Sequence, residues 1–147
     1  QGDARYVGLT GSQVVTGAKT FTSAVTMAGS ATFTGSVQVS TAVNVNTVTL
    51  TDAASITSSF DTGNTFVVTL GGNRTLAAPT SAGIGQTGSI RIIQDATGGR
   101  TLSYNTAWQF VSGSAPTMDT SAGAQSILVY SCRSATTIDA VMLHDFK

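Results

Sequence analysis

The stretch from Thr65 to Tyr104 limits the possible folds most, because it holds three runs of alternating apolar residues. The alternating residues are Phe66, Val68 and Leu70, then Ile90 and Ile92, then Leu102 and Tyr104. Alternation with period two between Gly, Pro, Asn and Asp clusters is typical of β-strands with one buried face. The two glycines in Asp95–Arg100 can supply the positive φ of a tight hairpin. We therefore expect this stretch to form the centre of an antiparallel sheet.

The composition favours strands over helices. Only 10% of the residues are charged, and all seven acidic residues are aspartates. Glutamate is a good helix former, whereas aspartate favours turns, so the bias argues against long surface helices. Thr, Ser, Val and Gly dominate instead, and these residues suit strands and turns. The chain is predicted to be all-β.

Charge and hydropathy argue against two classes of partner. The net charge is zero and the basic residues are scattered singly, so nucleic-acid binding lacks its electrostatic footprint. No apolar run is long enough to cross a bilayer, so membrane insertion is not expected. The chain does not begin with Met, which indicates a longer parent protein. Cys132 is the single cysteine and is expected to be a buried apolar residue rather than half of an internal disulfide.

An apolar stripe of constant parity marks the N-terminal part. It comprises Phe21, Val25, Met27, Phe33, Val37, Val39, Val43 and Val45. A twelve-residue offset relates Gly17, Thr20–Thr22 and Val25 to Gly29, Thr32–Thr34 and Val37. A ladder of strands this narrow cannot enclose its own apolar face. The stripe must fold back on the C-terminal part or be covered by sister chains. We favour a multi-chain β shaft, with an interface at Phe21, Val25, Met27, Phe33, Val37 and Val39.

The parity of the apolar residues shifts after Val45, since Val48 and Leu50 occupy even positions. This shift places a boundary between a shaft at residues 1–46 and a head at residues 47–147. The head shows some eight short alternating runs and no apolar pattern of helical length. Such spacing predicts an antiparallel β-sandwich, jelly-roll-like in organisation.

Catalytic signatures are weak. Glycan hydrolysis needs two facing carboxylates, but most of the aspartates stand in turn-like sequence, where they have a structural explanation. The chain has one His and one Cys, and neither stands in a local motif typical of a Ser-His-Asp or Cys-His catalytic site. His144 could ligate a metal on an oligomer axis, although an exposed terminal histidine is the simpler interpretation. We expect no enzymatic activity, no cofactor and no metal.

A dense aromatic group suggests a docking surface. Tyr104, Trp108 and Phe110 either pack in the core or present rings to a partner, as exposed aromatic residues do at binding sites. Asp119 lies in the loop predicted at residues 112–123. The candidate receptor-binding residues are Tyr104, Trp108, Phe110 and Asp119.

Two segments resemble phage tail fibres. The N-terminal TGSQVVTGAKTFTSAVT is similar to segments of bacteriophage tail-fibre proteins. The motifs GGNRTL and IIQDATGGRTL, the Trp that follows, and the later ILVYSCRSATTIDAVML resemble the C-terminal head module of these fibres.

The resemblance implies a homotrimeric fibre tip that contacts a host-surface glycan or outer-membrane protein. It also implies an N-terminal part that attaches to the tail, synthesis in the host cytoplasm, and a place in the virion, outside the cell. The alternatives are a structural spacer or capping module of the virion and a polysaccharide depolymerase.

Overall fold

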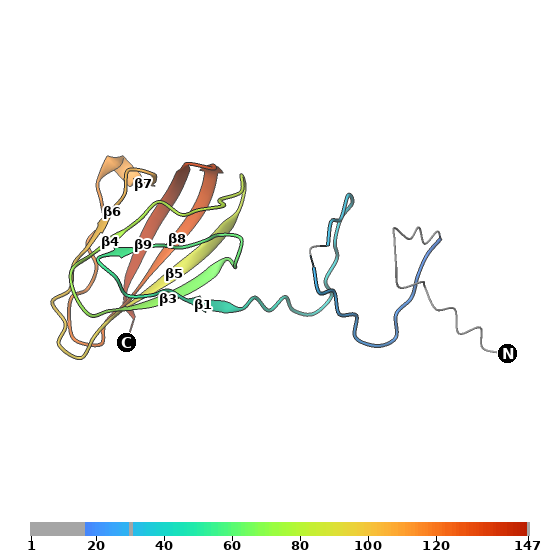
Figure 1. Ribbon diagram of the computed structural model, residues 1–147, viewed down its shortest axis with the longest axis horizontal. Helices are drawn as coiled ribbons and strands as arrows, with labels where there is room; N and C mark the ends of the chain where they lie inside the picture. Colours follow the sequence, from blue (N-terminus) through green and yellow to red (C-terminus); the bar gives the residue numbers. More distant parts are fainter. Residues whose placement is uncertain (1–16, 30, 147) are drawn as a thin grey trace. The chain divides into compact units, whose positions relative to one another are not determined.

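The computed structural model describes residues 17–29 and 31–146 (Figure 1). The chain forms two units, Gln1–Ser40 and Thr41–Lys147. Residues 17–29 and 31–46 form no strand within the single chain, and the side chains of the apolar stripe are 50–71% exposed. A shaft built from several chains therefore stays a prediction.

The head is built from nine strands and one short 3-10 helix, η1, at Val111–Gly113. The strands are β1 (Thr47–Thr49), β2 (Ser55–Ile56), β3 (Thr65–Leu70), β4 (Arg74–Leu76), β5 (Thr87–Gln94), β6 (Leu102–Tyr104), β7 (Trp108–Phe110), β8 (Gln125–Ser134) and β9 (Thr137–Phe146). They form a six-stranded sheet in the order β1-β3-β5-β8-β9-β7 and a three-stranded sheet in the order β2-β4-β6. The all-β prediction is confirmed.

The direction of pairing differs from the antiparallel, jelly-roll-like prediction. From β1 to β6 the chain alternates between the two sheets, so that β1, β3 and β5 pair in parallel, and so do β2, β4 and β6. The β8–β9 hairpin then adds two antiparallel ladders, and β7 pairs in parallel with β9. Residues 71–73 and 95–101 carry the chain from one sheet to the other. The hairpin predicted at Asp95–Arg100 is therefore wrong.

The core lies between the two sheets and is rich in aromatic rings. Phe60 stacks on Phe66 and on Tyr130, with ring centroids 5.5 and 4.5 Å apart. Apolar residues of both sheets complete the core: Ile56, Val68, Leu70, Leu76, Ile90, Ile92, Leu128, Cys132 and Ile138 are at most 2% exposed. On β3 and β5 the inward residues are those that the alternation predicted, because side chains on a strand point to opposite faces in turn.

The strand register gives the head two distinct ends. Thr47, Thr65 and Ser89 are partners across the large sheet, at the end that also carries the turn between β8 and β9. We call the opposite end, formed by residues 50–54, 71–73, 95–101 and 119–124, the loop end. Its loops lie close together in Figure 1, at the end of the sheet where β9 ends and β8 begins.

Ion pairs and backbone bonds hold the loop end together. Arg74 forms a two-pronged pair with Asp52, at 2.6 Å from Nε to Oδ1 and 2.7 Å from Nη2 to Oδ2. Arg100 Nη2 lies 2.7 Å from Asp95 Oδ2. The backbone N–H of Gly99 donates to the Thr120 carbonyl at 2.7 Å, which joins two of the loops. These corners are therefore fixed in position even though they lie at the surface.

The two pairs predict acid-sensitive stability. The hydrogen bond from Arg74 lowers the pKa of Asp52, and that from Arg100 lowers the pKa of Asp95. A carboxyl whose pKa is lower in the folded state stabilises the fold above its unfolded pKa, and this contribution is lost as the pH falls through the folded value. We expect a melting temperature that is flat from about pH 7 to 5 and falls below about pH 4.

A double variant, Asp52→Asn with Asp95→Asn, provides the control. It should melt at a lower temperature than the native chain at pH 7 and show a shallower decline in acid. An acid decline as steep as that of the native chain would show that other carboxyls carry the effect.

Candidate functional site

Trp108 is a core residue. Its side chain is 4% exposed, and its indole Nε1–H donates to the Ala77 carbonyl at 2.8 Å. Its ring meets Tyr130 edge to face, with centroids 6.2 Å apart. An indole that is buried and hydrogen-bonded cannot contact a receptor, so the structure corrects the docking role that the sequence suggested for Trp108.

Tyr104 and Phe110 are half-buried neighbours of this core. Their rings meet at 65° with centroids 4.7 Å apart. Burial raises the pKa of Tyr104 to about 12, so the phenol stays protonated at neutral pH. Both residues line a shallow hollow of about 220 Å³ that also includes Asn105, Thr106 and Gln109. Both side chains are partly buried and also pack against the core.

Asp119 lies elsewhere, in a hollow of about 290 Å³ at the loop end. The hollow is lined by Asp119, residues 121–124 and Phe146. Asp119 Oδ1 accepts a hydrogen bond from the backbone N–H of Ser121 at 2.8 Å, which fixes the carboxylate at the start of the loop. The structure thus separates Asp119 from the three aromatic residues with which the sequence grouped it.

Phe146 is the functional candidate that the sequence did not reveal. It ends β9, pairs in register with Gln125 at the start of β8, and is 38% exposed. This pairing brings the ring beside the 121–124 loop. A carboxylate and an aromatic ring then share one hollow, which offers a charged hydrogen-bond acceptor next to an apolar surface.

His144 is exposed on β9. Within the described residues, no group of three or more His, Cys, Asp or Glu side chains could hold a metal ion. A metal on an oligomer axis would need sister chains, so that interpretation stays untested.

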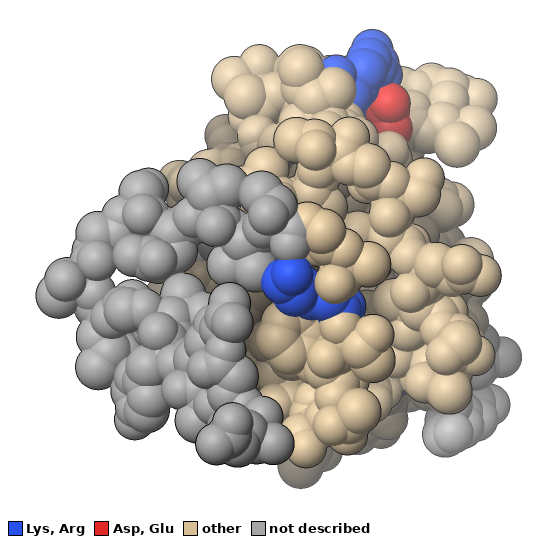
Figure 2. All heavy atoms as spheres, turned by 90° about the vertical axis from the view of Figure 1, so that its right-hand side faces the viewer, with Lys and Arg blue, Asp and Glu red and all other residues tan. Residues whose placement is uncertain are grey.

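The surface carries few charges. Basic side chains do not gather into a stripe on the face shown in Figure 2. In the part of the chain that the structure describes, no helix has the length and hydropathy to span a bilayer.

The head is an all-β domain whose loop end carries the hollow lined by Asp119 and Phe146. Residues 53–133, more than half of the chain, match the family described as "Putative phage tail fibre C-terminal domain". The chain therefore belongs to this family of phage tail fibre proteins, and as such it is a component of the virion. No curated protein and no solved structure shows a significant match.

Proposed function

We propose that this tail fibre domain is a non-catalytic, homotrimeric tip that binds the host cell surface through the hollow at its loop end. The observation that carries the proposal is the placement of Asp119 and Phe146 in one hollow, at the end of the head opposite the start of β1. The head begins at β1, whose first residue lies at the end opposite the loop end. Surface loops held on a rigid scaffold are the usual carriers of binding residues.

The hollow suits a carbohydrate. A carboxylate accepts strong hydrogen bonds from sugar hydroxyls. The flat face of the Phe146 ring can pack against the C–H groups of a pyranose. A shallow site of about 290 Å³ has room for one or two sugar units rather than a buried ligand. A host-surface glycan is therefore the receptor class that this chemistry supports better than an outer-membrane protein.

Trimeric assembly would compensate for a weak single site. Once one copy has bound, binding of the other two becomes intramolecular, which raises the overall affinity without any new contact. The part of the fibre upstream of this chain would hold the tip on the tail.

The variant Asp119→Asn tests the site. Asparagine keeps the side-chain oxygen that accepts from Ser121, so the loop should fold, but the charge that strengthens hydrogen bonds to a ligand is lost. We expect the Asp119→Asn variant to inhibit phage adsorption to host cells at least about tenfold less well than the native chain does.

The matched control is Asp61→Asn, which changes a carboxylate in the turn before β3, at the other end of the head. It should compete like the native chain. Equal competition by both variants would remove Asp119 from the site. A native chain that neither competes nor binds host cells would favour the structural spacer or capping module instead. Release of reducing ends from host glycan would favour a depolymerase.

A further inference from the structure

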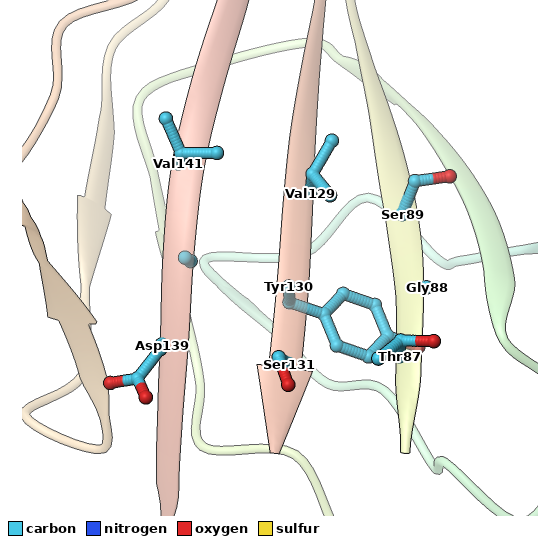
Figure 3. Close-up of a pocket in the computed structure, with 9 residues that line it drawn as sticks. Thr87, Gly88, Ser89, Val129, Tyr130, Ser131, Asp139 and Val141 are labelled. Carbon is cyan, nitrogen blue, oxygen red and sulfur yellow. The ribbon is translucent and has the colours of Figure 1, made fainter. Parts of the chain in front are cut away.

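The hollow at the loop end takes its shape from a loop, so it depends on what holds that loop in place. The concavity of about 640 Å³ on the outer face of the six-stranded sheet differs in this respect, because its labelled residues lie on β5, β8 and β9 (Figure 3), where strand pairing fixes them. At the loop end, Phe146 belongs to a strand, whereas Asp119 and residues 121–124 belong to the segment before β8. We call residues 119–124 the site loop.

The corner at residues 95–101 and the end of β5 hold the site loop through the backbone. Hydrogen bonds run from Gly99 N–H to the Thr120 carbonyl at 2.7 Å, from Gly123 N–H to the Asp95 carbonyl at 3.1 Å, and from Gln94 N–H to the Ala124 carbonyl at 2.9 Å. These bonds reach the site loop near its start and at its end. The position of the site loop is therefore set by the corner beside it.

Gly98 lies where the corner packs directly against the site loop. It is buried, and its φ of +69° is one that residues with a side chain rarely adopt. A Cβ at this position would lie 2.6 Å from the Ala122 nitrogen and 2.7 Å from the Thr120 carbonyl oxygen. Both are backbone atoms, which cannot rotate aside as the end of a flexible side chain can. A side chain at position 98 would therefore push the corner and the site loop apart.

Side-chain hydrogen bonds hold the corner on its other side. Asp95 Oδ1 accepts from the Gly98 N–H at 2.8 Å and from the Thr97 N–H at 3.0 Å, while Asp95 Oδ2 lies 2.7 Å from Arg100 Nη2. The buried Gln94 side chain donates to the Arg100 carbonyl at 2.9 Å and accepts from the Arg100 N–H at 3.0 Å. The corner is thus the more firmly held partner, so the site loop is the part that a side chain at position 98 would displace.

We propose that Gly98 is a positioning residue for receptor binding, because it lets the corner touch the site loop and so sets where Asp119 stands relative to Phe146. The inference rests on the receptor site proposed above and adds to it a residue outside the hollow. The positive φ that the sequence predicted for a hairpin is present at Gly98. In the structure it serves the contact between two loops.

A shift of the site loop would reach the carboxylate directly. Asp119 Oδ1 accepts from the Ser121 N–H, and residue 121 lies between the two residues whose backbone atoms face Gly98. Phe146 would stay in place, because its strand position is set by pairing with Gln125. Displacement of the site loop therefore changes the spacing of the two groups that the receptor would contact.

The test compares Gly98→Ala with Gly85→Ala in the full chain. Gly85 also has a positive φ, +79°, but a Cβ there would meet nothing within 4 Å, and it lies in the turn before β5, at the other end of the head. Both variants carry the backbone strain of alanine at positive φ, and only Gly98→Ala pushes on the site loop. At equal concentrations of folded protein, we expect Gly98→Ala to inhibit phage adsorption at least about tenfold less well than the native chain, and Gly85→Ala to inhibit it within about twofold of the native chain.

Amide hydrogen exchange, followed by NMR, separates positioning from loss of stability. The Gly99 N–H reports the contact between corner and site loop, and the Leu128 N–H reports the central strand β8. In Gly98→Ala, exchange at Gly99 should accelerate at least about tenfold more than exchange at Leu128, because local opening affects only the first, whereas global unfolding accelerates both by the same factor.

If Gly98→Ala does not fold, Asp95→Ala gives the same two measurements, since it removes the acceptor of the Gly98 N–H without adding a side chain at position 98. Inhibition equal to that of the native chain, or equal acceleration of exchange at Gly99 and Leu128, would overturn Gly98 as a positioning residue. The site itself would then still stand on the result for Asp119→Asn. A native chain that does not inhibit adsorption would overturn the proposed receptor site and this inference with it.

Discussion

Replacing Trp108 with alanine is expected to destabilise the head by about 3–5 kcal/mol, the usual cost of removing a large aromatic side chain from a core. The substitution would leave a cavity beside Phe60 and Tyr130 and would leave the Ala77 carbonyl without the donor that it now has at 2.8 Å. Urea denaturation followed by circular dichroism measures this loss as a lower midpoint.

The neighbouring residue on β7 provides the control. Gln109 is exposed, so Gln109→Ala should change the stability by at most about 0.5 kcal/mol. A variant Trp108→Ala that unfolds at the native midpoint, yet adsorbs poorly to host cells, would contradict the core assignment and restore the docking role. Loss of adsorption together with loss of stability would instead follow from unfolding.

The central strands and their buried faces could be predicted from the sequence. The alternation in Thr65–Leu70 and Gly88–Gln94 predicts strands whose inward residues, such as Phe66 and Ile90, are fully buried in the structure. The prediction succeeded because side chains alternate between the two faces of a strand, and the face with the apolar residues is the one that is buried.

The direction in which these strands pair could not be predicted in the same way. Glycine-rich connections suit a hairpin within one sheet and also a corner between two sheets, and alternation is the same in both. One signal was present: GGNRTL at residues 71–76 and GGRTL at residues 98–102 lead into β4 and β6, which are parallel neighbours. Similar corners that recur along a chain favour stacked turns of a coil over successive hairpins.

The candidate site depended on tertiary structure. Tyr104, Trp108 and Phe110 are close in sequence, but β7 turns the indole of Trp108 into the core. Asp119 and Phe146 are far apart in sequence, and the pairing of β8 with β9 is what brings them to one hollow. A local sequence motif cannot predict this proximity, because it depends on the pairing of β8 with β9.

Gly88→Ala is expected to be the most disruptive single methyl addition in the head. Gly88 pairs with Tyr130 across β5 and β8, and the ring of Tyr130 occupies the space that a side chain at position 88 would need. A Cβ there would lie 1.9 Å from the Asn64 carbonyl oxygen and 2.5 Å from the Tyr130 hydroxyl. Neither group can simply move aside, because the carbonyl accepts from the Ser89 N–H at 2.9 Å and from the Tyr130 hydroxyl at 3.1 Å.

The expected cost is about 3 kcal/mol or more, at the upper end of what overpacking usually costs, since both β3 and β8 must shift. Thermal unfolding should show a lower midpoint, and soluble yield should fall. Gly83→Ala is the matched control: its Cβ would meet only Gln86 Oε1, at an ordinary 3.7 Å, and should leave the midpoint nearly unchanged. Adding Tyr130→Phe to Gly88→Ala removes the hydroxyl contact but not the carbonyl contact, so it should restore only part of the loss. Full recovery in the double variant would show that the tyrosine hydroxyl, rather than the backbone of residue 64, is what requires glycine at this position.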